Sequence, residues 1–157
     1  MERIDFKDLP DTTTPITADN LNLLQDNIEN IFTDIKDWTP SLANASATYA
    51  IQTGKYIKIG KLVFVWFRLR GTINSVSEPR YAYVNGLPYT CYFETSGSLF
   101  EHAGISNDDT RNVLLRVVNR QLAIQKDDAQ AGVAIEKWYP SENTFYLGGS
   151  AVYITNE

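Results

Sequence analysis

Apolar residues recur at helical spacing near the start of the chain. Within the stretch from Ala18 to Trp38 they are separated by three, four, three, four and three residues, at Leu21, Leu24, Ile28, Ile31, Ile35 and Trp38. This spacing places them on one face of an α-helix and matches the a and d positions of a coiled-coil heptad. We therefore predict a helix over residues 18–38 whose apolar face is an oligomerisation surface.

The flanking residues mark both ends of the predicted helix. Thr17 can act as the N-cap, and Asp19 adds a negative charge to the first turn, where the helix dipole favours it. Pro40 prevents the helix from continuing much beyond Trp38. Residues 1–17 contain two prolines and a run of threonines, so we predict an extended attachment arm there.

The residue types in the heptad bear on the number of helices that associate. Isoleucine at both a and d positions favours three or more strands over two. The flanking e and g positions are Asn20, Gln25, Asn27, Phe32 and Asp34, and they offer almost no interchain charge pairing. The repeat is short for a coiled coil, so an amphipathic helix packed on its own domain is the alternative.

After the predicted helix, the pattern changes from helical spacing to alternation. Residues 39–47 include the small-residue stretch "SLANASA" and are predicted to be a linker. Residues 48–157 are rich in β-branched and aromatic residues, and we predict an antiparallel β-sandwich head domain, jelly-roll-like in topology. A hairpin is expected at Asn119 and Arg120, and a bend between two closing strands at Gly148 and Gly149. The expected fold class is mainly β with one N-terminal helix.

One predicted strand does not alternate. "LVFVWF", residues 62–67, is apolar at every position, so both of its faces need to be covered. The core of the domain can cover one face. A neighbouring subunit is the favoured cover for the other, and the N-terminal helix of the same chain is the alternative.

Charge and cysteine content narrow the function classes. The net charge is −5 and the basic residues are scattered, which argues against nucleic-acid binding. The single cysteine, Cys91, excludes an intramolecular disulfide framework and is expected to be a small buried residue. We recognise no signal peptide and no membrane span, so we expect synthesis in the cytoplasm.

Little in the sequence points to an enzyme. His102 is the only histidine and there is no CxxC pair, so a usual zinc site cannot be assembled. A dyad of Cys91 with His102 has no supporting local signature, and Asp108 and Asp109 are better explained by turn formation. We expect no catalytic residues, no metal and no cofactor.

Aromatic residues beside polar ones are the candidates for binding a receptor. Trp138 and Tyr139 precede a proline and a polar turn, and Arg80, Tyr81 and Tyr83 form a second group. Aromatic rings offer flat apolar faces to sugars or peptides, and polar neighbours add directional hydrogen bonds. The competing interpretation is that these rings belong to the core of the β domain.

Several segments resemble tail-fibre and head-fibre proteins of bacteriophages. "TPITADNLNLLQDNI" is similar to a segment near the N-termini of such proteins. "DWTPSL", "GKYIKIGKLVFV", the Gly-Leu-Pro turn of "VNGLPY" and the closing "FYLGGSAVYITNE" resemble their β-rich head domain. The order and spacing of these segments carry the resemblance, which touches both halves of the chain.

This resemblance implies a virion structural protein made in the bacterial host cytoplasm. It would be a homotrimer with an arm that contacts other virion proteins, a short coiled stalk, and a head that attaches to a host cell-surface glycan or protein. The alternatives are a purely structural capsid, neck or baseplate fibre without receptor binding, and a carbohydrate-processing enzyme on a fibre scaffold. We expect neither nucleic-acid binding nor membrane insertion.

Overall fold

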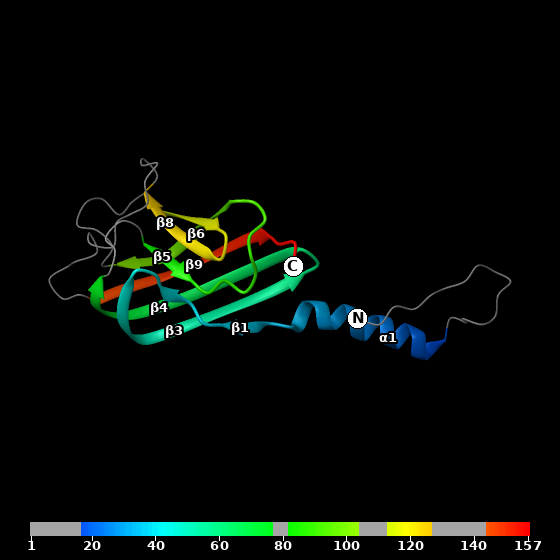
Figure 1. Cartoon of the computed structure of the whole chain (residues 1–157). Coiled ribbons are helices and arrows are strands. Elements are labelled where there is room, and N and C mark those ends of the chain that lie inside the picture. Colours follow the sequence, from blue (N-terminus) through cyan, green and yellow to red (C-terminus); the bar gives the residue numbers. More distant parts are fainter. Residues whose placement is uncertain (1–16, 77–81, 104–112, 127–143) are drawn as a thin grey trace. The chain divides into compact units, whose positions relative to one another are not determined.

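The computed structural model describes residues 17–76, 82–103, 113–126 and 144–157. The chain divides into two compact units, Met1–Ile35 and Lys36–Glu157, and we call the second the β domain. Its strands are β1 (Lys36–Trp38), β2 (Ser41–Leu42), β3 (Ala45–Ile59), β4 (Leu62–Val76), β5 (Tyr83–Asn85), β6 (Thr95–Ala103), β7 (Val113–Val118), β8 (Gln121–Lys126) and β9 (Thr144–Ile154) (Figure 1). The prediction of a mainly β, antiparallel fold with one helix is confirmed for the described residues.

The helix, α1 (Ala18–Thr33), begins as predicted and ends earlier. The backbone N–H of Asn20 donates to the Thr17 hydroxyl at 3.2 Å, which confirms Thr17 as the N-cap. Thr33 and Asp34 are poor helix formers, and Asp34, the C-cap, has left the helical conformation. Among the described residues, no helix has the length and apolar content needed to cross a membrane.

Trp38 is not part of the helix, which corrects the prediction of a helical stretch through this residue. It ends β1, is only 8% exposed, and meets Phe67 edge to face with 6.3 Å between ring centroids. Its indole N–H lies within hydrogen-bonding distance of the Lys55 and Trp66 carbonyl oxygens, at 3.2 and 3.3 Å. A Cβ at Gly54 would lie 2.5 Å from the indole nitrogen. The ring therefore occupies space that only a glycine leaves open.

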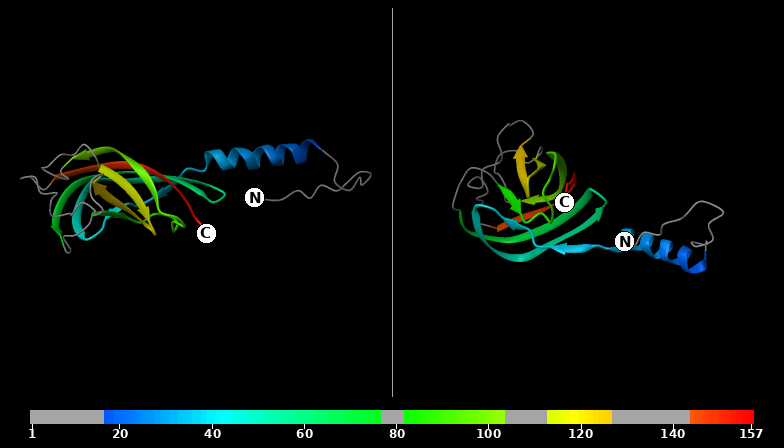
Figure 2. Two further views of the ribbon diagram at one scale, coloured as in Figure 1. Left: turned by 90° about the horizontal axis from the view of Figure 1, so that it is seen from above. Right: turned by 45° about the vertical axis from the view of Figure 1, so that its right-hand side comes forward.

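The described strands form one sheet in the order β1-β3-β4-β9-β6-β7-β8-β5-β2. Every described pair is antiparallel. The sheet curves strongly, so that β3, β4 and β9 lie on one side of the β domain and β5 and β8 on the other (Figures 1 and 2). The backbone N–H of Leu42 in β2, the last strand of the order, donates to the Tyr49 hydroxyl in β3, the second strand, at 2.8 Å.

One buried cluster fills the space inside the curved sheet. β4 contributes alternate residues from Val63 to Leu69, and β9 contributes Phe145, Leu147 and Tyr153. The opposite side contributes residues of β5, β7 and β8: Val84, Leu115, Val117, Leu122 and Ile124. Cys91 also belongs to this cluster, which confirms the prediction that it is buried. Apolar burial of this extent is the main stabilising contribution to such a domain.

The predicted linker, residues 39–47, is instead part of the β domain. It contains β2 and the first residues of β3. Leu42 and Ala43 are each 6% exposed, and the Ala43 N–H donates to the Tyr83 carbonyl at 2.9 Å. Ala43 is buried, and Ala45 and Ala47 are packed against the core cluster, so these small residues belong to the packed domain.

The two turn predictions near the C-terminal end have different outcomes. The hairpin at Asn119 and Arg120 is confirmed, because Val118 pairs with Gln121 and Asn119 has the positive φ of 53° that such turns require. The bend at Gly148 and Gly149 is wrong, since β9 runs unbroken through both glycines.

Close packing explains these two glycines. A Cβ at Gly148 would lie 2.6 Å from the Phe100 ring, and one at Gly149 would lie 2.6 Å from a methyl group of Leu115. Both positions lack a side chain because neighbouring side chains occupy that space.

Candidate functional site

The helix carries a stripe of exposed apolar side chains. Leu21, Leu24 and Ile28 are 55%, 46% and 49% exposed and follow each other at helical spacing. The side chain of Ile31 lies outside the described residues. Ile35 is 52% exposed but follows the end of α1, so it is not a helical heptad position. We call Leu21, Leu24 and Ile28 the apolar stripe of α1, and burying one such side chain fully contributes about 1.5–3 kcal/mol.

A second exposed apolar area lies on the outer side of β3, β4 and β9. The strand register places Ile59 beside Leu62 and Leu62 beside Ile154. The next row of outward-facing residues along these strands consists of Ile57, Phe64 and Val152. Together with half-buried Trp66 these residues form what we call the apolar outer face: Ile57, Ile59, Leu62, Phe64, Trp66, Val152 and Ile154.

The exposed fractions of residues 62–67 show which of the two faces of the apolar stretch "LVFVWF" the core covers. Val63, Val65 and Phe67 point into the core and are at most 2% exposed, whereas Leu62 and Phe64 are 43% and 37% exposed. On the same outer side, Ile59, Val152 and Ile154 are 37%, 42% and 37% exposed. An exposed contiguous apolar area of this kind marks an interaction surface more often than a single exposed leucine does.

Further along the same side of the sheet, the surface becomes charged. Arg68 Nε lies 2.8 Å from one Glu101 carboxylate oxygen, and Arg70 pairs with the other oxygen. Hydrogen bonding by Arg68 is the main cause that lowers the pKa of Glu101, and Arg70 acts in the same direction. The Arg70 guanidinium also lies over the Tyr146 ring, 5.0 Å from its centroid. Sequence reasoning missed this cluster, although the alternation in "FRLRG" already places Arg68 and Arg70 on one side of a strand.

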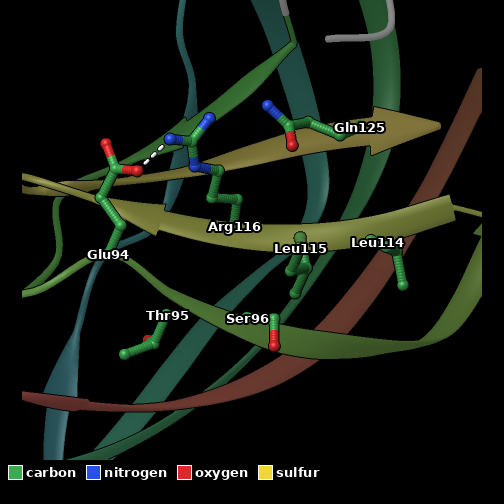
Figure 3. A pocket seen from close by; sticks show the side chains of 7 residues that line it. All are labelled: Glu94, Thr95, Ser96, Leu114, Leu115, Arg116 and Gln125. Carbon is green, nitrogen blue, oxygen red and sulfur yellow. Dashed lines mark hydrogen bonds and ion pairs between the residues drawn. The ribbon is translucent and has the colours of Figure 1, made fainter. Parts of the chain in front are cut away.

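An open depression of about 550 Å³ lies beside β6 and β7. It is lined by Glu94, Thr95, Ser96, Leu114, Leu115, Arg116 and Gln125. Figure 3 shows Glu94 and Arg116 turned toward one another, and these two side chains form an ion pair. Glu94 is the one carboxylate among the described lining residues, whereas most glycoside hydrolases act with two. The described lining residues therefore supply one of the two carboxylates that this chemistry uses.

The histidine and the cysteine considered for chemistry lie in the β domain. His102 is in β6, and its buried Nδ1 has no hydrogen-bond partner among the described residues. Burial raises the pKa of the Cys91 thiol, which disfavours the nucleophilic thiolate form. Among the described ranges, no three His, Cys, Asp or Glu side chains are grouped so that they could hold a metal ion.

The predicted receptor-binding residues are mostly outside the described part of the chain. Trp138, Tyr139, Arg80 and Tyr81 all lie there. Tyr83 is in β5 and half-buried. Exposed aromatic side chains that the sequence did not single out are Phe100, at 65%, and Tyr92 and Phe93, at 56% and 58%.

Comparison of the chain with protein-family models, with curated proteins and with solved structures finds no match.

Proposed function

We propose that this chain is a non-enzymatic structural protein of a bacteriophage virion, a short trimeric fibre that projects its β domain toward the host surface. The observation that carries the proposal is the apolar stripe of α1, because three large side chains at helical spacing are about half exposed in a single chain. Such a stripe is stabilised when other helices cover it. The resemblance of the sequence to phage fibre proteins supplies the virion context.

The trimer follows from the residue types of the heptad. Isoleucine at a and d positions favours three or more helices, and the shortened helix retains Ile28 at a and Ile31 at d. The proposal includes a three-stranded coiled coil at α1 and a jelly-roll-like arrangement of the β domain. In this proposal, residues 1–17 contact other virion proteins.

Attachment to a host glycan or protein would benefit from three copies of the β domain on one stalk. Three weak sites that bind together raise avidity without a tight single site. A purely structural fibre on the capsid, neck or baseplate is the second candidate, since the exposed apolar areas support assembly without requiring a receptor. A carbohydrate-processing enzyme is a third candidate, which loss of a host glycan polymer on incubation with the protein would favour.

Light scattering of the purified full chain at micromolar concentration tests the assembly. The expected mass is three times that of one chain, because a single chain leaves its apolar stripe in water. A monomer at this concentration would contradict both the coiled coil and the fibre.

A fluorescent fusion of the full chain tests attachment. We expect it to stain susceptible host cells, and an Ile28→Asp fusion with weakened assembly to stain them at least tenfold less because avidity is lost. Because the Ile28→Asp fusion carries the same fluorophore, it also controls for staining that the fluorophore itself causes. Absence of staining by the trimeric fusion across susceptible hosts would favour the purely structural role.

A further inference from the structure

The apolar outer face of β3, β4 and β9 lies at the end of the sheet where the chain enters the β domain. Lys36, the first residue of β1, pairs with Tyr56 of β3. The adjacent residue of β3, Ile57, pairs with Phe64 and so begins one of the apolar rows. The entry point of the chain and the apolar rows therefore occupy neighbouring positions in the register.

We propose that the apolar outer face packs against the same face of other copies of this chain, so that the β domains meet in the trimer as well as the helices. This inference rests on the proposed trimer and adds to it a second interface. Its central residues are Leu62 and Phe64 of β4 with Val152 and Ile154 of β9.

The short connection between α1 and β1 limits how far apart the entry points of neighbouring copies can lie. α1 ends at Thr33 and β1 begins at Lys36. The backbone between these two residues can extend over at most about 11 Å. Axes of packed helices lie about 8–10 Å apart. When three helices associate, the entry points of neighbouring copies are therefore held within about 30 Å of each other, and each entry point adjoins an apolar row.

The charges at the border of this face are compatible with contact between identical copies. Identical copies bring identical charges together, so a face with an unpaired charge would repel itself. Lys55, next to Trp66 in the register, forms an ion pair of 2.5 Å with Asp37 on β1. Further along β4, beyond Trp66, Glu101 pairs with both Arg68 and Arg70 and leaves one net positive charge outside the apolar rows. A membrane surface is a poorer occupant, because anionic lipids attract basic surfaces and this chain has a net charge of −5.

Phe64→Lys in the full chain tests this interface, with Thr72→Lys as the matched control. Both positions are exposed and on the outer side of β4, eight residues apart, but Thr72 lies outside the apolar rows. We expect Phe64→Lys to raise the concentration at which the trimer dissociates by at least tenfold, and Thr72→Lys to leave it unchanged. The measurement is mass by light scattering over a dilution series, with circular dichroism to verify folding.

The possible results separate this interface from the proposed function. A trimeric wild type with an equally stable Phe64→Lys trimer would overturn the interface and leave the fibre intact. A monomeric wild type would contradict the proposed trimer itself, and would favour a cover from the chain's own helix or from another virion protein. If Phe64→Lys fails to fold, the milder Phe64→Thr, which keeps a β-branched residue in the strand, is measured by the same criterion.

Discussion

Trp38→Ala is expected to lower the free energy of unfolding of the β domain by about 3–5 kcal/mol, the range for removing a large buried aromatic side chain. Trp38 fills the space above Gly54, contacts Phe67 and has its indole N–H near two backbone carbonyl oxygens. Its removal leaves a cavity that the surrounding strands cannot fill without moving. The measurement is urea unfolding at one fixed protein concentration, because association also contributes to apparent stability.

Asp37→Ala is the matched control for Trp38→Ala. Asp37 is the neighbouring residue of β1, and its exposed ion pair with Lys55 is expected to contribute at most about 1 kcal/mol. Equal and small effects of the two substitutions would contradict the position of Trp38 in the core. They would favour instead a helix that continues to Trp38.

Ile28→Asp is expected to convert the proposed trimer into monomers at concentrations where we expect the wild type to be assembled. The substitution removes one large apolar side chain from each helix and places a carboxylate among three associating helices, where desolvation disfavours the charge. A loss of about 3 kcal/mol per chain corresponds to more than a hundredfold in the dissociation constant. Mass by light scattering over a dilution series measures this shift.

Asn22→Asp provides the control for the added charge. Asn22 is exposed on α1 and follows Leu21, so it lies beside the stripe rather than within it. Its substitution is expected to leave the mass unchanged. An unchanged mass for Ile28→Asp as well would show that the β domains assemble without the helix, a result that Phe64→Lys then examines directly.

Much of the architecture could be predicted from local signals in the sequence. Thr17 as N-cap and the hairpin at Asn119 depend on neighbouring residues alone, and both predictions are confirmed. The stretch around Phe64 was predicted to be a strand, and β4 confirms this part of the prediction. These features depend on periodicity and backbone preference, which a single sequence displays.

The errors occur where a distant residue decides the local structure. Trp38 continues the helical spacing in the sequence, but Gly54 and Phe67 offer its ring a place in the core. Gly148 and Gly149 resemble a bend, yet Phe100 and Leu115 pack over them. Glu101 completes a charge cluster with arginines more than thirty residues away. Neither spacing nor composition reveals which residues will meet after folding.

The way β1 joins the sheet also has a mechanical consequence. If the chain is the proposed fibre and is fixed through its N-terminal arm, tension would enter the β domain at Lys36 and would be carried first by the three residue pairs between β1 and β3. Trp38, at the far end of this short strand, is held in the core by its ring. It would therefore serve as the anchor that transmits load from the stalk to the long hairpin of β3 and β4, and would protect the short strand from being peeled away.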